Sequence, residues 1–156
     1  MPVFTIRPAT PADAEALCAL HKDAVRRLCL GAYTATEIEA WLREREPAGF
    51  RHAMTKGGET MLVAERDAAV AGFASIKGTM LFGLYVDPES GRGAGQPLLQ
   101  AAEDEVRRSG AAALSLQSTL NAVPFYRKHG YMREARSTRR LGGRDLAVLD
   151  MIKSLS

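Results

Sequence analysis

Three glycines in a short stretch of the chain have the spacing of a phosphate-binding loop. Gly91, Gly93 and Gly95 follow an apolar run at residues 79–87, and an amphipathic stretch begins directly after them. Glycine lets the backbone approach a ligand closely and adopt positive φ, and the first turn of a helix adds free N–H groups with partial positive charge. The pattern therefore predicts a pyrophosphate site where a strand meets a helix.

The residues around these glycines argue against two common nucleotide sites. No Lys-Ser or Lys-Thr pair follows the loop, as a nucleotide triphosphatase would require. A dinucleotide site requires a GxGxxG spacing in an opening βαβ unit, followed by an acidic residue about 20 positions later. The loop lacks this pattern. A glycine-rich turn that binds no ligand stays an alternative, because this spacing alone is a weak signal.

The periodicity of the apolar residues predicts the elements that position this loop. A Thr34–Glu37 capping box opens a second helix, which Pro47 and Gly49 are expected to close. The other helices are expected over residues 11–29, 93–108 and 123–129, and the strands over residues 3–7, 60–65, 70–77, 79–87, 112–117, 131–140 and 146–153. We therefore expect one mixed α/β (α+β) domain over residues 1–156, with helices on the faces of a mostly antiparallel central sheet.

Composition narrows the class of protein. The chain has 156 residues, of which 46% are hydrophobic and 25% charged, as in an ordinary single globular domain. No apolar run approaches the ~18 residues that span a bilayer, and the N-terminus does not resemble a signal peptide, so a cytoplasmic protein is expected. Cys18 and Cys29 would lie roughly 16 Å apart on one helix, too far for a disulfide, and they are expected to be packing residues.

The net charge of +3 is too small to indicate a nucleic-acid-binding protein. The spacing of the arginines in the densest basic cluster favours the solvated face of a strand pair over an RNA site. The cluster consists of Arg133, Arg136, Arg139, Arg140 and Arg144. No metal site is expected.

Two motifs resemble those of the GCN5-related N-acetyltransferases (GNAT). Residues 84–88, 92–95 and 98–99 resemble motif A of that family. Residues 121–131 resemble motif B, in which Asn, Phe-Tyr and Gly-aromatic recur at this spacing. The expected order of elements is similar to that of the family along nearly the whole chain.

The resemblance implies that acetyl-CoA binds in a V-shaped cleft between two splayed parallel strands, residues 79–87 and 112–117. The strand backbone at Leu84, Tyr85 and Val86 would hold the pantetheine arm. Asn121 and Lys128 would add to the cofactor site, although Asn121 could equally be a helix N-cap. The pyrophosphate would bind the backbone amides of Arg92, Gly93, Ala94, Gly95 and Gln96. Ser90 departs from the family pattern, in which Gln or Arg is usual, and this removes one side-chain contact to the phosphates.

The resemblance also implies direct attack of a primary amine, from a small molecule or a peptide, on the thioester. Tyr126 aligns with the family tyrosine that protonates the departing thiolate, and a phenol of pKa ~10 can donate to a thiolate whose thiol has a pKa of ~8.5. Alternatively, Tyr126 is a half-buried aromatic residue with its hydroxyl on water. The candidates for the general base are Glu65 at a strand end, His21 and His52. His129 is expected to mark a helix C-terminus.

The acceptor pocket is expected between the first two helices and the loop after Gln117. Its candidate lining residues are Tyr33, Trp41, His21 and Phe82, with core packing as the alternative for Trp41 and Phe82. Three alternative functions stay open: an acyl-CoA-binding module without catalysis, a protein N-terminal or lysine acetylase, and a nucleic-acid-binding domain with steeply salt-dependent binding. A homodimer could form through an edge strand of the C-terminal hairpin.

Overall fold

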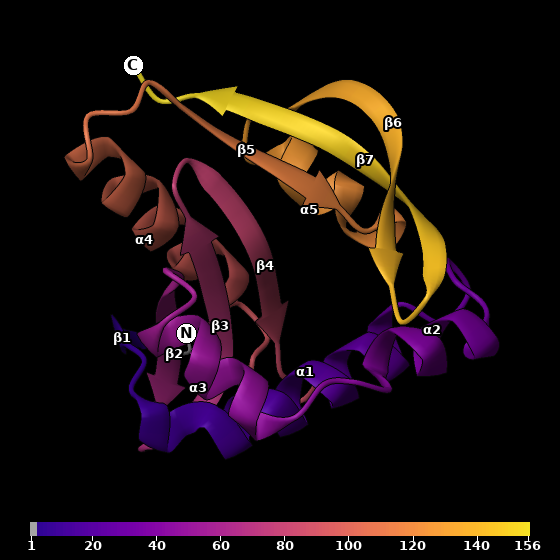
Figure 1. The fold of residues 1–156 in the computed structure, drawn as a ribbon. Coiled ribbons are helices and arrows are strands. Elements are labelled where there is room, and N and C mark those ends of the chain that lie inside the picture. Colours follow the sequence, from indigo (N-terminus) through magenta and orange to yellow (C-terminus); the bar gives the residue numbers. More distant parts are fainter. Residues whose placement is uncertain (1–2) are drawn as a thin grey trace.

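The apolar runs expected as strands form one seven-stranded sheet in the computed structural model, which describes residues 3–156 (Figure 1). The strands are β1 (Thr5–Pro8), β2 (Thr60–Arg66), β3 (Ala69–Lys77), β4 (Met80–Val86), β5 (Ala113–Ser118), β6 (Met132–Leu141) and β7 (Arg144–Ser154). Their spatial order is β1-β2-β3-β4-β5-β7-β6, and only the β4–β5 pair is parallel. The expected mixed, mostly antiparallel sheet is therefore confirmed.

The helices follow the expected pattern with one addition. They are α1 (Ala14–Leu28), α2 (Ala35–Leu42), α3 (Pro47–Thr55), α4 (Gly95–Arg108) and α5 (Val123–Lys128), with 3₁₀ turns at Pro11–Asp13 and Leu120–Ala122. The capping box at Thr34 and Glu37 is present. The expectation that Pro47 and Gly49 end the second helix is wrong, because Pro47 begins α3. Proline suits a first helical turn, where its missing N–H would have no intrahelical partner.

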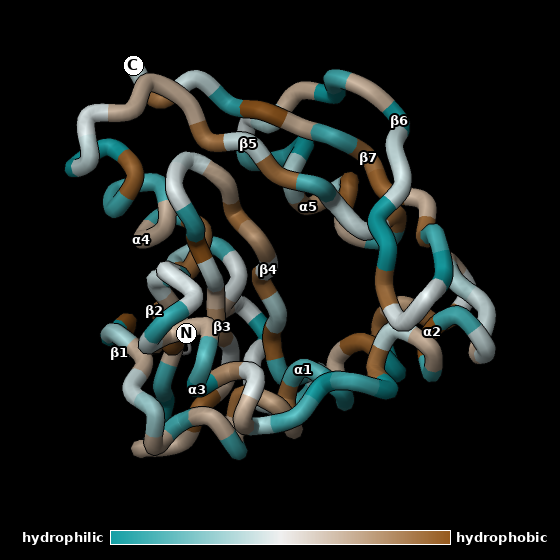
Figure 2. The backbone as a smooth tube through the Cα atoms, viewed as in Figure 1, coloured by the Kyte–Doolittle hydropathy of each residue, from teal (hydrophilic) through white to brown (hydrophobic). Residues whose placement is uncertain are grey.

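Helices cover both faces of the sheet. On one face, Leu17 of α1 and Phe50 of α3 pack against Phe73 of β3. On the other face, apolar residues of α4 such as Leu98 and Val106 belong to the largest core cluster. Alternate residues of β5 are buried, and both hydrophobic and hydrophilic positions occur along β5 and β7 (Figure 2). Both cysteines are buried free thiols, as expected for packing residues.

The sheet opens between its two parallel strands. β4 pairs with β5 only at Met80 and Leu81, and the two strands diverge beyond that point (Figure 1). Across β3, Ile76 pairs with Leu81 and Ser75 pairs with Gly83, so Phe82 is an extra residue on β4. A bulge of this kind bends a strand. The bend leaves the β5-facing edge of β4 without strand pairing from Phe82 onward, and the expected pair of splayed parallel strands is present.

A buried ion pair ties α4 to the C-terminal strand. The side chain of Glu103 on α4 is only 3% exposed. It accepts hydrogen bonds from the Tyr131 hydroxyl at 2.9 Å and from Lys153 Nζ of β7 at 3.1 Å. This network fixes α4, whose N-terminus faces the glycine loop, relative to the strands beyond the opening. Within residues 3–156, no helix is long and apolar enough to cross a membrane.

Candidate active site

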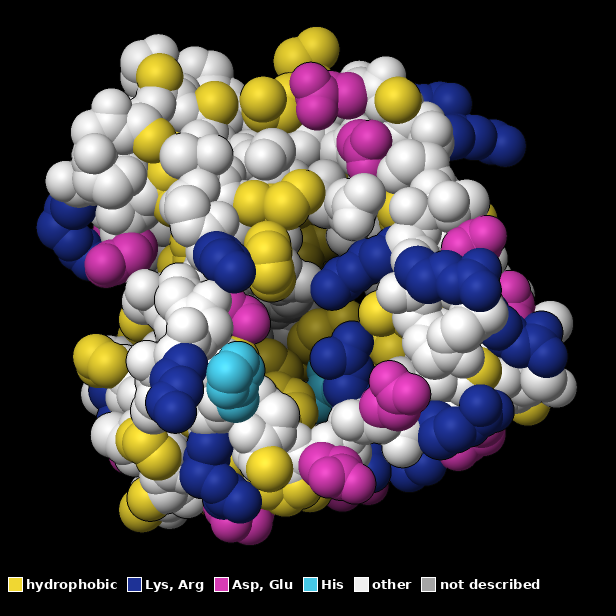
Figure 3. All heavy atoms as spheres, in the orientation of Figure 1, with side chains coloured by type: hydrophobic (Ala, Val, Ile, Leu, Met, Phe, Trp, Pro, Cys, Tyr) yellow, Lys and Arg dark blue, Asp and Glu magenta, His cyan; other side chains and the backbone are white. Residues whose placement is uncertain are grey.

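Two cavities share Tyr85 as a wall residue. The larger, of about 570 Å³, lies between β4, the glycine loop and α5. The smaller, of about 290 Å³, lies between β4, α1, the loop after α2, α3 and β6. Tyr85 lines both cavities, and it belongs to the part of β4 that has left β5. Figure 3 shows a hollow near the centre of one face of the molecule, with hydrophobic side chains on its floor and Lys or Arg side chains at its rim.

The glycine loop is folded by its own hydrogen bonds. The Asp87 carboxylate accepts hydrogen bonds from the amides of Glu89 and Ser90, each at 2.9 Å. The Gly91 amide donates to the Asp87 carbonyl. A Cβ atom on Gly91 would lie 2.2 Å from the Ala71 carbonyl oxygen, so only glycine fits at this position. The loop is therefore held close to β3 before it reaches the start of α4.

The loop presents free amides to the larger cavity. Arg92, Gly93, Gly95 and Gln96 line this cavity. Within residues 3–156, none of their four amides donates to a backbone carbonyl. Ala94, which was expected among the phosphate ligands, is buried, and its amide donates to the Gly91 carbonyl. The structure therefore brings four of the five expected amides to the site, where free N–H groups at a helix N-terminus suit a phosphate.

The other expected cofactor residues also line the larger cavity. Leu84, Tyr85 and Val86 pair with β3 along one edge only, so the opposite edge of β4 faces the cavity. Asn121 and Lys128 line the cavity from the segment that follows β5. Asn121 is not the N-cap of α5, because Ala122 takes that position.

Tyr126 lines the larger cavity from α5. It is 6% exposed, and its ring packs edge-on against Phe125 and Tyr131. Burial raises the pKa of the Tyr126 hydroxyl well above its usual range, so this group is protonated at neutral pH. His129 also lines the cavity and ends α5, as expected.

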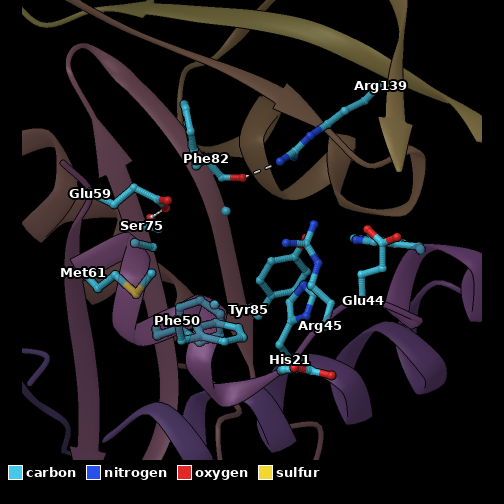
Figure 4. Close-up of a pocket in the computed structure, with 16 residues that line it drawn as sticks. His21, Glu44, Arg45, Phe50, Glu59, Met61, Ser75, Phe82, Tyr85 and Arg139 are labelled. Carbon is cyan, nitrogen blue, oxygen red and sulfur yellow. Dashed lines mark hydrogen bonds between the residues drawn. The ribbon is translucent and has the colours of Figure 1, made fainter. Parts of the chain in front are cut away.

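His21 has an unusual place in the wall of the smaller cavity (Figure 4). It is 5% exposed, and its ring stands at 90° to that of Tyr85 with centroids 4.5 Å apart. Its Nδ1 atom is buried and has no hydrogen-bond partner within residues 3–156. Burial, helped by the positive charges of Arg45 and Arg139, lowers the pKa of His21 to about 3. The imidazole is therefore neutral at physiological pH.

Charged groups flank the aromatic wall of the smaller cavity. The Ser75 hydroxyl donates a hydrogen bond to the Glu59 carboxylate, and Ser75 pairs with Gly83 beside the bulge. Arg45 and Arg139 also line this cavity, and Arg139 Nη1 lies 3.4 Å from the Phe82 carbonyl oxygen. Sequence reasoning assigned no role in the site to Glu59, Ser75 or Arg45, because only the strand register and the helix packing bring them together.

Three residues proposed from the sequence lie outside the two cavities. Glu65 Oε2 is 3.0 Å from Arg7 Nε at the pairing of β1 with β2. His52 is exposed on α3. The Tyr33 hydroxyl donates to the Ala147 carbonyl at 2.6 Å and accepts from the Leu120 amide at 3.1 Å, so Tyr33 joins β7 to the loop after β5. None of the three lines either cavity, whereas His21, Trp41 and Phe82 line the smaller one.

Within the described residues, no group of three His, Cys, Asp or Glu side chains is placed to hold a metal ion.

Comparisons with known proteins agree with this geometry. The family model described as an acetyltransferase (GNAT) domain matches residues 29–155. A crystal structure of a GCN5-related N-acetyltransferase from Rhodopseudomonas palustris is 32% identical, with a TM-score of 0.90, and the match covers 99% of this chain and 97% of that one. A search of curated proteins gave no match.

Two further solved structures share the fold at 24% identity. One is the PaiA N-acetyltransferase of Thermoplasma acidophilum in complex with coenzyme A, with a TM-score of 0.78 and coverage of 97% of this chain and 99% of that one. The other is YncA of Salmonella typhimurium, described as a putative acetyltransferase with its cofactor acetyl-CoA. Its TM-score is 0.72, and the match covers 99% of this chain and 95% of that one.

Proposed function

Because this chain belongs to the GCN5-related N-acetyltransferase family, we propose that it transfers the acetyl group of acetyl-CoA to a primary amine of a small molecule or peptide. One observation carries the proposal. The cavity lined by the free amides of the glycine loop and a second cavity share Tyr85 as a wall residue, beside the unpaired edge of β4. A donor and an acceptor can therefore be bound at the same time, with their reacting groups near Tyr85.

The residues of the larger cavity fit the parts of acetyl-CoA. The amides of Arg92, Gly93, Gly95 and Gln96 would bind the pyrophosphate, and the Lys128 side chain would add positive charge. The free edge of β4 at Leu84, Tyr85 and Val86 would hydrogen-bond the pantetheine arm as an added strand does. The thioester would then lie near Tyr85, which lines both cavities.

The reaction forms a C–N bond between the amine and the acetyl carbon and breaks the C–S bond of the thioester. A backbone N–H of β4 would stabilise the negative oxygen that develops during attack. Tyr126 would protonate the departing thiolate and recover its proton from solvent. The geometry supports this role, because Tyr126 lines the cavity that would hold the donor and keeps its proton at neutral pH.

Glu59 is our candidate for the group that accepts the proton of the attacking amine. It lines the smaller cavity, which would bind the acceptor and is called the acceptor cavity below, and it binds Ser75, which pairs with Gly83 next to the point where β4 leaves β5. Glu65 is ion-paired with Arg7 and lines neither cavity, so we do not retain it. His21 is a poor base, because its burial and the positive charges of Arg45 and Arg139 oppose protonation of the imidazole.

The smaller cavity, of about 290 Å³, supports an acceptor that is a small molecule or the end of a peptide. We propose that the enzyme acts in the cytoplasm and binds no nucleic acid. In support, the arginine cluster is not one continuous basic surface: Arg139 lines the acceptor cavity and Arg140 pairs with Asp145. A homodimer through the β6 edge is part of the proposal.

Calorimetric titration with acetyl-CoA tests the donor site. We expect wild-type protein to bind acetyl-CoA with a Kd in the micromolar range, and Gly95→Trp to abolish binding. A Cβ at Gly95 would already lie 3.1 Å from the Phe125 ring, so an indole there occupies the cavity. Circular dichroism and thermal unfolding establish that the variant is folded, and Gly49→Trp in the other cavity serves as a matched control that keeps donor binding. A wild-type protein that does not bind millimolar acetyl-CoA would contradict the proposal.

A further inference from the structure

Two arginines face the acceptor cavity without a carboxylate partner. Arg45 lies in the loop after α2 and Arg139 lies on β6, so separate parts of the chain bring them to one cavity. Both are partly buried. Within residues 3–156, no Asp or Glu oxygen lies within 4.0 Å of either guanidinium group. In Figure 4 both side chains point into the cavity, and Glu59 lies on its opposite side.

Two guanidinium groups without a direct ion-pair partner favour an anionic ligand. Two partly desolvated positive charges in one cavity repel each other, and burial removes part of their hydration. The buried Nδ1 of His21, in the same wall, also has no hydrogen-bond partner within the described chain. Glu44, Glu46 and Glu59 also line the cavity, but none of their oxygens lies within 4.0 Å of either guanidinium group, so neither arginine has a direct ion-pair partner among the described residues. A ligand anion in the cavity would satisfy both guanidinium groups.

A carboxylate matches these groups best. A guanidinium binds a carboxylate through two parallel N–H···O bonds, and such charge-assisted bonds are about twice as strong as neutral ones. The remaining wall is apolar and aromatic, formed by Met61, Phe50 and Phe73. The volume of about 290 Å³ suits a ligand of amino-acid size. A polycationic amine, by contrast, would bring further positive charge next to the two arginines.

Given the acetyl transfer proposed above, we propose that the acceptor is an amine that also carries a carboxylate, with an apolar side chain, as in an apolar α-amino acid. Its carboxylate binds Arg45 and Arg139. Its ammonium group faces Glu59 and the β4 bulge, where the donor thioester is placed. Its side chain packs against Phe50, Met61 and Phe73.

Matched acceptors test the role of the carboxylate. Initial rates of CoA release are measured with a panel of apolar L-amino acids. Each amino acid is compared with its carboxamide and with the corresponding amine that lacks the carboxylate, and spermidine is tested as a polycationic amine. We expect wild-type kcat/KM for the preferred amino acid to exceed that for its carboxamide by about tenfold or more. Arg45→Gln and Arg139→Gln should each lower kcat/KM for the amino acid about ten- to hundredfold and change that for the carboxamide by less than about threefold.

Two arginines close to these in sequence provide controls. Arg43 follows α2, and Arg136 lies on β6; both are exposed and neither lines the cavity. Arg43→Gln and Arg136→Gln remove the same charge and should leave the preference for the amino acid unchanged. If these controls reduced the preference as strongly as the cavity variants do, a general charge effect would explain it and the inference would be overturned.

The outcomes separate this inference from the proposed function. Acetyl-CoA binding with equal or faster acetylation of carboxamides or spermidine would overturn the carboxylate acceptor and leave the acetyltransferase proposal intact. No acetylation of any amine would contradict the proposed function instead. In that case, direct binding of the same amino acids, measured by ligand-observed NMR, still tests the cavity: wild-type binding that Arg45→Gln weakens supports the inference, and no binding overturns it.

Discussion

Tyr126 carries the proposed proton transfer through a single hydroxyl group. Tyr126→Phe keeps the ring that packs against Phe125 and Tyr131 and removes only that hydroxyl. We expect kcat to fall about a hundredfold, a typical contribution of a general acid, with less than a twofold change in the Kd for acetyl-CoA. Steady-state rates of thiol release and a calorimetric titration measure the two quantities. An unchanged kcat would indicate that water, not Tyr126, protonates the departing thiolate, and that Tyr126 is only a packing residue.

His21 makes the stability of the fold depend on pH. Its pKa is about 3 in the folded protein and 6.5 in the unfolded chain, so between these values only the unfolded state binds the proton. Stability contributed by the neutral imidazole is therefore lost as the pH falls below 6.5. We expect the free energy of unfolding of the wild type to fall by about 2 kcal/mol more than that of His21→Phe between pH 7 and pH 5.

Urea unfolding followed by circular dichroism at several pH values measures this difference. His52→Phe is the matched control, because His52 is exposed and its replacement should preserve the wild-type pH dependence. Parallel pH dependences for the wild type and His21→Phe would show that His21 titrates normally in the folded protein.

At the residue scale, the sequence predicts the donor side of the site better than the acceptor side. The glycine loop and the β4 residues proposed to bind the donor are contiguous in sequence, so a local pattern can indicate a shared ligand. The smaller cavity, proposed to bind the acceptor, instead joins Arg45, Glu59 and Arg139 from two loops and strand β6. Glu59 and Glu65 flank the two ends of the same strand, and only the register of β2 with β3 decides which end lies near the bulge. This register cannot be predicted from a local sequence pattern, because it depends on pairing between two strands.

At the scale of elements, Glu103 holds α4 against the strands beyond the opening. Glu103→Ala leaves Lys153 and the Tyr131 hydroxyl without their main partner, and we expect a loss of about 3 kcal/mol in the free energy of unfolding. Glu103→Leu combined with Lys153→Met removes both charges and should recover part of that loss. Chemical denaturation measures these changes. As a control, Glu105→Ala on α4, where the side chain is 39% exposed, should lower the free energy of unfolding by less than about 0.5 kcal/mol. If the double variant Glu103→Leu/Lys153→Met were as unstable as Glu103→Ala, the ion-pair explanation would be contradicted.

The elements themselves were largely predictable because their signals are local. Alternation in the strands, the helical spacing of apolar residues and the Thr34–Glu37 capping box each act within a few residues. The error at Pro47 has a physical reason, since proline both disrupts the interior of a helix and suits its first turn. The divergence of β4 from β5 is different: its bulge at Phe82 depends on pairing with β3, and the expectation of splayed strands came from the family resemblance.

At the scale of the whole molecule, the β6 edge determines how copies of the chain can associate. This edge strand carries exposed arginines, including Arg133 and Arg136. Like charges on an exposed edge oppose pairing with a second copy, and salt screens that repulsion. We expect a monomer of 16.9 kDa at low ionic strength and a dimer fraction that rises with salt. Sedimentation velocity at about 0.05 and 0.5 M NaCl measures this, and a dimer that dissociates with salt would point to another interface.

Tyr85 forms part of the wall of both cavities, which constrains how this enzyme can evolve or be redesigned. If the two cavities bind donor and acceptor as proposed, a substitution at Tyr85 changes both kinds of binding together, and selection for a new acceptor cannot act there without cost to the donor. Arg45 and Phe50 line the acceptor cavity alone. A lineage can therefore acquire new substrates by altering the loop after α2 and helix α3, while the cofactor half is inherited unchanged.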